Sequence, residues 1–368
     1  MKILMLSTDR TIFEKGSSAF NRMVDYSGLF DELHVLVLNA GEKHKIKVSD
    51  KLFIYGTGSK NKIRMFFDAI SLGKKMKGID VVSAQDPFEV GYVGMKIAKK
   101  IKAKLHLQIH TDFMSPYFTY VHKFKNIIRR KIAKKVLPKA DGIRVVSERI
   151  KRSLDQFKLK IIPVVLPIFV DPDKLHGHPS NFDIHKKYPQ FSSILLMITR
   201  LESEKDFESA FQALKRVHVI FPNTGLVIVG DGSLREALKM RVKELKIEHH
   251  VCFEGQHADI QAYIKTADIY LQTSLYEGYG MTFIEVATLR LPIVSTRVGI
   301  MGDVFTHGKS AMICPPQDVG CLARSISALI DDNDKAYQMY MEALRNVNEH
   351  CISKDSYLEH YKNSLYIK

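Results

Sequence analysis

Short apolar runs alternate with amphipathic stretches along almost the whole chain. In the first half, these runs are nearly continuous in leucine and β-branched residues, which is typical of parallel strands covered on both faces. The strand-like runs are Ile3–Leu6, Leu33–Leu38, Val81–Ala84, Leu105–Ile109, Ile143–Val146 and Ile162–Val165. Between them, Glu89–Ile101 and Phe124–Leu137 have helical periodicity. This alternation predicts a doubly wound α/β sheet.

The same pattern begins again after the proline-bearing segment Pro163–Pro172, which is followed by His176-Gly177-His178-Pro179. Proline removes backbone donors and ends regular elements, so this segment predicts a linker between two domains, residues 1–168 and 169–368. The second set of strand-like runs is Ile194–Ile198, Leu226–Val229, Val251–Phe253, Ile269–Leu271, Ile293–Val294 and Met312–Ile313. Helical patterns occupy Phe207–Val219, Ser233–Leu245, Ile260–Thr266 and Met281–Leu289. Past Asp318 the chain looks wholly helical, and a return of these helices to the first domain stays open.

Composition agrees with two cytoplasmic domains. A chain of 368 residues is longer than a domain with a single hydrophobic core usually is. No window of the sequence reaches the roughly 18 unbroken apolar residues that a membrane span needs. The apolar start runs directly into Ser7-Thr8-Asp9-Arg10 without a cleavage site, which predicts a buried first strand and no signal peptide. The cysteines form no CxxC pair and all lie in the second half, so we expect neither a disulfide framework nor a zinc site. They are Cys252, Cys314, Cys321 and Cys351.

Charge is divided unevenly between the two halves. The formal net charge is +15, yet the chain through Val170 holds 33 basic and 15 acidic residues, and the remainder holds 22 and 25. The basic half is compatible with nucleic acid, an anionic membrane or a phosphorylated acceptor, and composition alone does not choose between these partners.

The strongest chemical signal is the segment Ser274–Glu285, which follows a predicted strand and opens a predicted helix. Glu277 lies in the loop and Glu285 about one turn into the helix. The backbone amides of Gly280, Met281 and Thr282 lie at the helix N-terminus, where unpaired donors and the helix dipole favour a phosphate. Glu285 can then accept hydrogen bonds from ribose hydroxyls, and Glu277 can face a sugar ring. The alternative is a glycine turn with two surface glutamates.

A second signal, Thr199–Asp206, follows the first strand of the second domain. Arg200 and Lys205, five residues apart, can hold a diphosphate from two sides and neutralise the charge on a leaving group. No Asp-x-Asp pair at a strand end offers a metal ligand set, so we expect no metal or other cofactor. The alternative is a solvated loop whose cations pair with Glu202 and Glu204.

Further candidates lie at other strand ends. His110, which follows Leu105–Ile109, could hydrogen-bond a sugar hydroxyl or serve a structural role. Gly16 lies in the loop after the first strand, where backbone amides could contact a phosphate or the acceptor. Gly230 and Gly255 could lie against a nucleobase through backbone contacts, or could be tight turns.

These residues resemble the retaining glycosyltransferases of glycosyltransferase family 4. The resemblance is carried by the Glu-x7-Glu pair (Glu277 and Glu285), by Arg200-Leu201-x3-Lys205, and by Gly230-Asp231-Gly232. Further segments that match are Phe253-Glu254-Gly255, Leu291-Pro292-Ile293-Val294, His110-Thr111-Asp112 and Val145-Val146-Ser147-Glu148. The chain departs from the family pattern at Thr199 and Asp206, where the family often has glycine, and at Gly16-Ser17, where a glycine doublet is frequent. These departures leave the donor chemistry intact but put the role of the first loop in acceptor binding in doubt.

The resemblance implies a GT-B fold, in which two doubly wound Rossmann-like domains face a central cleft. It also implies a nucleoside diphosphate sugar donor and retention at the anomeric carbon. Glu285 would bind the ribose, and Arg200 and Lys205 the diphosphate. Glu277 and the amides of Met281 and Thr282 would meet the sugar and the distal phosphate, and His110 would complete the sugar pocket. Transfer would be a front-face substitution without metal.

A UDP-sugar is weakly favoured over a GDP-sugar, and the expected acceptor is a bacterial cell-surface glycan or a lipid-linked molecule. A sugar-nucleotide epimerase of similar architecture and a catalytically inactive sugar-nucleotide sensor stay open as alternatives. A basic nucleic-acid-binding protein is the rival outside enzymology, but zinc spacing and an RNA-binding signature with paired aromatics are missing, so we expect no nucleic acid.

The stretch Lys123–Lys139 contains eight basic residues and no acid, with apolar residues near helical spacing. Such a helix could dock on anionic lipid, each basic residue contributing about 1 kcal/mol, and would make the protein peripheral on the inner membrane face. Alternatively, the apolar stripe faces the domain core and the basic residues are solvated. Because the core needs the stripe, we expect shallow electrostatic docking rather than insertion.

Overall fold

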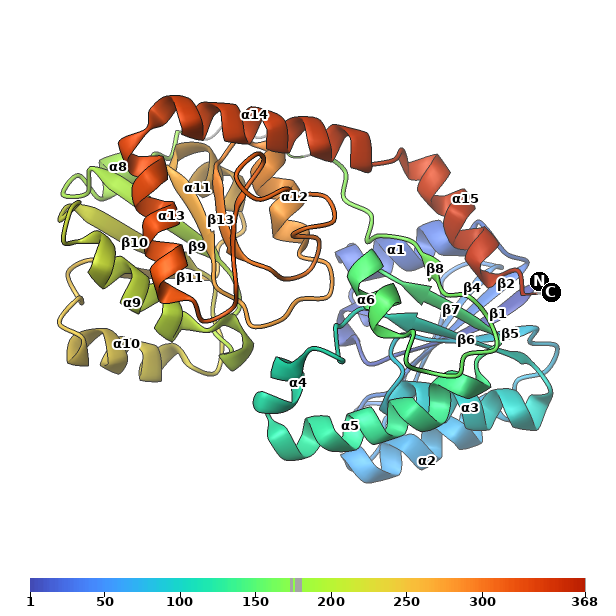
Figure 1. Ribbon diagram of the computed structural model, residues 1–368. Coiled ribbons are helices and arrows are strands. Elements are labelled where there is room, and N and C mark those ends of the chain that lie inside the picture. The colour runs from blue at the N-terminus through green and yellow to red at the C-terminus, as the bar shows by residue number, and fades with distance from the viewer. Residues whose placement is uncertain (173–174, 176–180, 368) are drawn as a thin grey trace. The chain divides into compact units, whose positions relative to one another are not determined.

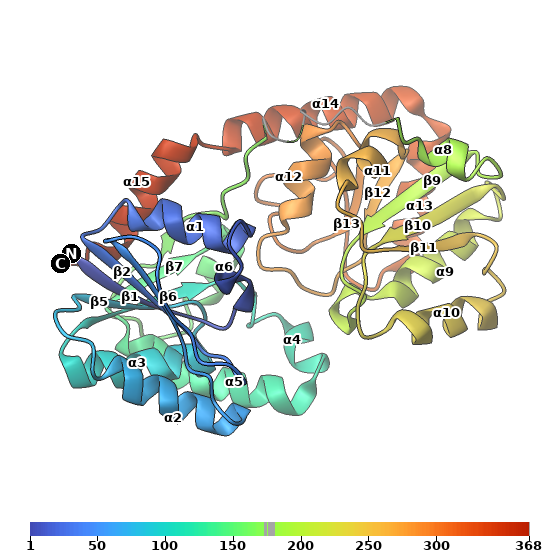
Figure 2. The same cartoon turned by 180° about the vertical axis from the view of Figure 1, so that it is seen from behind.

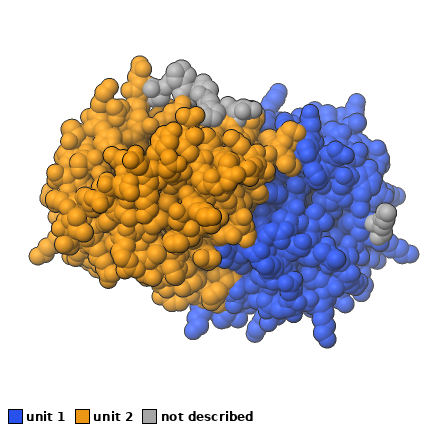
Figure 3. Space-filling model, turned by 45° about the horizontal axis from the view of Figure 1, so that its top comes forward, with its two compact units in different colours: residues 1–114, 122–167, 354–368 blue, residues 115–121, 168–353 orange. Residues whose placement is uncertain are grey.

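The computed structural model describes residues 1–172, 175 and 181–367 of the chain and divides it into two compact units. The first unit consists of residues 1–114, 122–167 and 354–368, and the second of residues 115–121 and 168–353 (Figure 3). Residues 176–179 of the predicted linker lie outside the described part of the chain.

The first unit is built on an eight-stranded sheet with the order β3-β4-β2-β1-β5-β6-β7-β8. Neighbouring strands are parallel except β3 and β4, and Ile3 of the central strand pairs with Leu33 on one side and Val81 on the other. The strands are β1 (Lys2–Ser7), β2 (Glu32–Val37), β3 (Lys45–Lys47), β4 (Leu52–Gly56), β5 (Val81–Ala84), β6 (Lys104–Ile109), β7 (Gly142–Val145) and β8 (Val164–Val165).

Helices cover both faces of this sheet. α2, α3 and α5 lie together on one face, with α3 in contact with both of the others, and α1 and α15 lie on the opposite face (Figures 1 and 2). The bounds are η1 (Arg10–Phe13), α1 (Ser18–Ser27), α2 (Lys62–Gly73), α3 (Glu89–Ile101), α5 (Lys123–Val136), η2 (Leu137–Lys139), α6 (Glu148–Ser153) and α15 (Lys354–Leu365).

A buried arginine fastens α15 to this sheet. Arg144 on β7 is 2% exposed and donates hydrogen bonds to Gln108 Oε1 at 3.0 Å and to the hydroxyl of Tyr357 at 3.0 Å. Its guanidinium also reaches the carbonyls of Leu166 and Pro167, where the chain leaves the first unit. One side chain therefore holds both the departing segment and the returning helix, so α15 belongs to the first unit.

The second unit has a six-stranded parallel sheet with the order β11-β10-β9-β12-β13-β14. The strands are β9 (Ser193–Ile198), β10 (Thr224–Val229), β11 (Val251–Gly255), β12 (Ile269–Gln272), β13 (Ile293–Thr296) and β14 (Met312–Cys314). The helices are α4 (Pro116–Tyr120), α8 (Ile184–Lys187), η3 (Ser203–Lys205), α9 (Phe207–Val217), α10 (Arg235–Glu244), α11 (Ile260–Thr266), α12 (Met281–Thr288), α13 (Val319–Asp331) and α14 (Asn333–His350).

Alternation along β12 assigns its side chains to two layers. Leu271 joins the core formed with α9, α10 and α13, including Phe211 and Leu322. Tyr270 points to the other layer, where its ring meets Phe283 of α12 edge-on at 6.2 Å. Both faces of the strand are therefore buried, which explains why its side chains before the last residue are aliphatic or aromatic.

The structure confirms the predicted doubly wound α/β fold and the helical C-terminal region. It also shows one feature that the cysteine pattern argued against. Cys314, at the end of β14, and Cys321, in the first turn of α13, are joined by a disulfide across seven positions of sequence. They come together because the chain turns directly from the strand into the helix; Cys252 and Cys351 are free.

Candidate functional site

The glutamate loop, residues 273–280, follows the carboxyl end of β12 and leads into α12. Gly280, the residue before the helix, has a positive φ of 87°, a conformation that favours glycine. A second glycine, Gly299, lets another segment approach the loop closely, since a Cβ there would lie 2.3 Å from the carbonyl oxygen of Tyr279. Ile300 donates a backbone hydrogen bond to the same carbonyl at 3.0 Å. The shape of the loop is therefore fixed from outside as well as by its own turn.

One oxygen of Glu277 is the centre of the site. Glu277 Oε1 accepts hydrogen bonds from Lys205 Nζ at 2.5 Å, Ser274 Oγ at 2.9 Å and Gln272 Nε2 at 3.0 Å. The Glu277 side chain is 17% exposed and that of Lys205 is 12% exposed. The structure thus joins the two predicted charged groups in a mostly desolvated ion pair, and it adds Gln272 and Ser274, which the sequence did not single out.

Lys205 comes from the lysine loop, residues 199–206, which is tied to the glutamate loop by backbone contacts. Thr273 Oγ1 donates to the carbonyls of Lys205 and Asp206, at 2.8 and 2.9 Å. Leu275 donates its backbone N–H to the carbonyl of Glu204 at 2.8 Å. These contacts explain how residues about 70 positions apart hold a fixed geometry.

Arg200 is far more exposed than Lys205 and contacts a different carboxylate. Its side chain is 75% exposed, and Nη2 contacts Glu204 Oε1 at 3.3 Å. The alternative charge pair with Glu204 is thus present for the arginine, whereas the lysine pairs with Glu277. An exposed pair of this kind is weak and leaves the guanidinium able to turn toward a ligand.

The first turns of α12 hold the remaining residues of the strongest motif. The amides of Met281 and Thr282 lie in the first turn, where the helix itself offers no acceptors. Glu285 is half-buried, and this burial raises the pKa of its carboxyl. Within the described part of the chain, we find no hydrogen bond to the Glu285 carboxylate. This helix end therefore offers donors for an anion beside an acceptor for hydroxyl groups.

Two further predicted glycines support the lysine loop. Gly230 has a φ of +138°, and a Cβ there would lie 1.9 Å from the carbonyl oxygen of Thr199, so no other residue fits without displacing the loop. The N–H of Gly230 donates to the carbonyl of Gly255 at 2.7 Å. Gly255 also has a positive φ, and its Cβ position would lie 3.3 Å from the guanidinium of Arg235. Both glycines therefore have a structural role at strand ends, independent of any contact with a ligand.

His110 and Gly16 belong to the first unit, and the other predicted residues belong to the second. His110 follows β6, and its Nε2 atom is buried without a hydrogen-bond partner. Burial, with the nearby charges of Arg144 and Arg22, lowers the pKa of His110 to about 3, so the imidazole is neutral at physiological pH. Gly16 has a φ of +92° and open space around its Cβ position, directly before Ser17, which caps α1.

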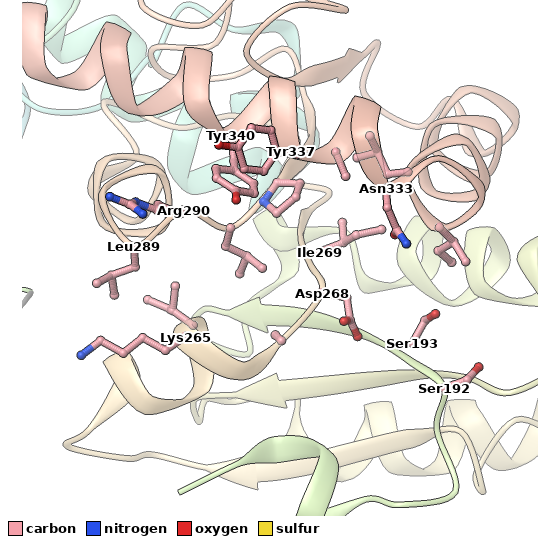
Figure 4. Close-up of a pocket in the computed structure, with 17 residues that line it drawn as sticks. Ser192, Ser193, Lys265, Asp268, Ile269, Leu289, Arg290, Asn333, Tyr337 and Tyr340 are labelled. Atoms are coloured by element: carbon pink, nitrogen blue, oxygen red, sulfur yellow. The ribbon is translucent and has the colours of Figure 1, made fainter. Parts of the chain in front are cut away.

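A cavity of about 610 Å³ lies at the opposite, amino edge of the second sheet, beneath the first turns of α14 (Figure 4). Its lining includes Ser193, Asp268, Arg290 and Tyr337. Asp268 is already engaged by the backbone N–H of Ile194 at 2.6 Å and by His185 at 3.0 Å. The predicted site residues line a different edge of the sheet, and the cavity forms no part of their site.

Among the residues that the structure describes, no group of three or more histidine, cysteine, aspartate or glutamate side chains is arranged to hold a metal ion. Among these same residues, no helix has the length and hydropathy needed to cross a membrane.

Comparisons with known proteins agree with this arrangement. Residues 181–346 match the family described as "Glycosyl transferases group 1", and residues 30–174 match "Glycosyltransferase Family 4". Among curated proteins, the chain is 31% identical to glycogen synthase of Mycobacterium tuberculosis over 140 residues, which cover 38% of this chain and 34% of the relative. It is 26% identical to alpha-monoglucosyldiacylglycerol synthase of Streptococcus pneumoniae over 246 residues, 63% of this chain and 55% of the relative. The matches thus span a third to just over half of these relatives.

Solved structures share the fold over the full length. The Anabaena protein HepE in complex with UDP and glucose superposes with a TM-score of 0.77 at 17% identity, covering 99% of each chain. The apo form of the lipopolysaccharide outer core galactosyltransferase WaaB gives a TM-score of 0.70 at 18% identity, covering 100% of this chain and 99% of the other.

Proposed function

Since the chain belongs to the group 1 glycosyltransferases of family 4, we propose that it transfers a sugar, with retention, from a nucleoside diphosphate sugar to a glycan or lipid-linked acceptor. A UDP-sugar is the favoured donor. The observation that carries the proposal is the largely buried Lys205–Glu277 pair beside the N-terminus of α12, with the Glu285 carboxylate available one turn further on. HepE, which shares the fold, has been solved with UDP and glucose and with UDP-glucose.

Each part of the donor has a matching group in the second unit. The amides of Met281 and Thr282 suit the distal phosphate, because a helix N-terminus presents unpaired donors and a positive dipole end. Lys205 has three N–H donors, so it can keep its bond to Glu277 while another proton reaches a phosphate oxygen. The Glu285 carboxyl, to which we find no hydrogen bond in the described part of the chain, can pair with ribose hydroxyls.

The proposed step is a front-face substitution. The acceptor oxygen bonds to the anomeric carbon as the bond from that carbon to the phosphate oxygen breaks, and the acceptor proton passes to the departing phosphate on the same face. Negative charge that develops on the diphosphate is stabilised by Lys205, by Arg200 and by the N-terminus of α12. Glu277 holds Lys205 in place, and the neutral imidazole of His110 suits a sugar hydroxyl because it adds no charge.

Transfer and its alternatives can be separated with a donor panel. UDP-, GDP- and ADP-linked hexoses are incubated with the full-length protein, and nucleotide release and the anomeric configuration of the released or transferred sugar are followed by NMR. Release of UDP with an α-configured product from an α-linked donor supports the proposal. An inverted product contradicts retention, and conversion of the donor to its epimer without nucleotide release identifies an epimerase.

We further propose that α5 contacts an anionic membrane surface that carries the acceptor. The expectation that its apolar stripe faces the core is wrong for the first half of the helix: Phe124 is 81% exposed, Ile127 37% and Ile128 42%, whereas Ala133 and Val136 are buried. The apolar residues differ in exposure along α5 because only the later turns of the helix pack on the core of the unit. Exposed apolar side chains among lysines suit insertion at a lipid interface rather than purely electrostatic docking.

A neighbouring helix extends this surface. Ile63 and Phe67, one turn apart on α2, are 74% and 68% exposed, and α2 lies on the same face of the first sheet as α5 (Figures 1 and 2). By contrast, Arg129 and Arg130 are engaged within the unit, with the Glu89 carboxylate at 3.0 Å and the Phe113 carbonyl at 2.8 Å. Substituting these arginines would therefore affect folding as well as membrane docking, and a vesicle-binding assay could not separate the two effects.

Vesicle sedimentation tests the surface. We expect Phe124→Ser with Ile128→Ser to reduce binding to vesicles containing phosphatidylglycerol, and Lys131→Gln with Lys134→Gln to reduce it further at low salt. Val219→Ser with Ile220→Ser is the matched control, because these residues are 84% and 67% exposed in the second unit. Equal binding by all variants would refute this part of the proposal without affecting donor chemistry.

A further inference from the structure

Two buried polar side chains lie beneath the glutamate loop, on the α12-facing side of β12. Tyr270 and Gln272 are two positions apart, so they project from the same face of the strand, away from the layer that holds Leu271. Tyr270 is 0% exposed and Gln272 5% exposed. Burying polar groups is unfavourable unless they are hydrogen-bonded, so their partners indicate what they are for.

The two residues form a chain of hydrogen bonds that ends on Glu277. The hydroxyl of Tyr270 donates to Gln272 Oε1 at 2.5 Å, and Gln272 Nε2 donates to Glu277 Oε1 at 3.0 Å. An ionised carboxylate can only accept, so the amide must turn its NH2 group toward Glu277 and its oxygen toward Tyr270. The carboxylate therefore sets which way the glutamine amide faces, and the tyrosine hydroxyl holds the amide in place by donating to its oxygen.

The same hydroxyl also lies close to the first turn of α12. The Thr282 side chain lies near it, and so do the carboxylates of Glu277 and Glu285. Burial is the largest cause that raises the pKa of Tyr270 well above its ordinary value, so the hydroxyl keeps its proton and can serve as a donor. This buried hydroxyl thus lies near residues of both parts of the proposed donor site.

We propose that Tyr270 and Gln272 are positioning residues for the transfer reaction: through Gln272 the tyrosine orients the Glu277 carboxylate. The inference rests on the proposed function, because it assigns these residues to the same site. Neither residue contacts the donor; both act through Glu277. Two of the three donors to Glu277 Oε1, Ser274 and Lys205, belong to loops, so the Gln272 amide is the donor anchored in the sheet.

Tyr270→Phe is the smallest change that breaks the chain. It removes only the hydroxyl, which leaves the buried Gln272 Oε1 without its donor. We expect the amide to shift toward another donor for that oxygen, which weakens its hydrogen bond to Glu277. We expect kcat for hydrolysis of a UDP-hexose to fall about tenfold, which equals about 1.4 kcal/mol, with a smaller change in KM. Tyr361→Phe is the matched control, because Tyr361 is also fully buried and its hydroxyl also meets a glutamine, Gln108, at 3.1 Å.

Gln272→Glu gives a readout that a purely structural role would not produce. Two carboxyls would then share one site, which raises the pKa of the introduced group because Lys205 already stabilises Glu277 as the anion. Protonated, the introduced carboxyl can donate to Glu277 as the amide does; ionised, it repels Glu277. Activity relative to the wild type should therefore increase as the pH falls. Gln338→Glu, on the exposed face of α14, controls for the added charge.

The experiment measures UDP release from the hydrolysed UDP-hexose between pH 5 and 8, together with Tm, for the wild type and these four variants. A tenfold lower kcat in Tyr270→Phe with normal Tyr361→Phe, and an acid-shifted profile in Gln272→Glu alone, support the proposal. Activity within twofold of the wild type, or a lower Tm with a wild-type pH profile in Gln272→Glu, would overturn it while the proposed function stands. A wild type that releases no nucleotide from any donor would overturn the proposed function and this inference together.

Discussion

The Lys205–Glu277 ion pair should make a measurable contribution to folding before any donor binds. The two side chains are only 12% and 17% exposed, and Nζ lies 2.5 Å from Oε1. Removing one partner of a fully buried pair costs about 3–5 kcal/mol, because an uncompensated charge stays behind. Glu277 would keep two donors, Ser274 and Gln272, so we expect Lys205→Met to cost about 2–3 kcal/mol.

A double-mutant cycle with Glu277→Gln isolates the pair. We expect Glu277→Gln alone, which leaves the Lys205 charge without its partner, to cost about 1.5–2 kcal/mol. Because the double variant Lys205→Met with Glu277→Gln leaves no buried charge, it should be no less stable than Lys205→Met alone, so the coupling energy equals the cost of Glu277→Gln. Thermal unfolding followed by far-ultraviolet circular dichroism suits a chain without tryptophan, and the single substitution should lower Tm by about 5–10 °C for a unit of this size.

An exposed pair supplies the control for this cycle. Lys239 Nζ contacts Glu236 Oε1 at 2.9 Å on the surface of α10, with side chains 42% and 77% exposed. Lys239→Met should change stability by about 0.5 kcal/mol or less. A coupling energy near zero at Lys205–Glu277, equal to that of the exposed pair, would refute the reasoning that this pair is desolvated and structurally important.

Four further outcomes follow from the same structure. The His110 imidazole should titrate near pH 3 by NMR, since its pKa is lowered by burial and by Arg144 and Arg22; a midpoint near 6.5 would contradict the buried geometry. His106 also has a pKa lowered to about 3, by burial and by Arg144. Below pH 6.5 these two histidines are therefore protonated in the unfolded state but not in the native state. Urea unfolding should show the free energy of unfolding falling from pH 6.5 toward 3, by up to about 1.4 kcal/mol per pH unit for each histidine. Gly230→Ala should destabilise far more than Gly308→Ala in thermal unfolding: both have positive φ, but only the first Cβ would collide with a carbonyl, that of Thr199. In urea without reductant, a thiol reagent should label Cys252 and Cys351 and leave Cys314 and Cys321 unlabelled; labelling of all four would contradict the disulfide.

Much of the fold was predictable because parallel strands buried on both faces are nearly continuous apolar runs. The predicted run Val81–Ala84 and helix Glu89–Ile101 coincide with β5 and α3. The strand β4, Leu52–Gly56, was not predicted, because its residues alternate between buried and half-buried and therefore give no continuous run. The helix α2 was not predicted either, because its Ile63 and Phe67 face solvent and blur the amphipathic pattern.

The loops that form the site could be predicted from the sequence, but the pairing of side chains within it could not. A strand-to-helix turn with two carboxylates was predicted from Gly280, Glu277 and Glu285, and the structure has that turn. Which cation meets Glu277 depends on how two distant loops pack, so Arg200 and Lys205 could not be told apart in sequence. Gln272 carries a weak signal, since it is a polar residue at the end of a buried strand, but its contact with Glu277 exists only in three dimensions.

The most direct test of the central claim is nucleotide binding by the second unit's predicted residues. Thermal shift of the full-length protein is measured with UDP, GDP, ADP and CMP in the presence of EDTA, for the wild type, for Lys205→Met and for the control Lys239→Met. At about 100 times its dissociation constant, a bound nucleotide adds about 2.7 kcal/mol, or about 5–10 °C in Tm for a unit of this size. We predict that UDP produces this shift in the wild type and in the control and that Lys205→Met abolishes it. If no nucleotide shifts the transition, or if Lys205→Met responds like the wild type, the assignment of the diphosphate site to the lysine loop and α12 is contradicted.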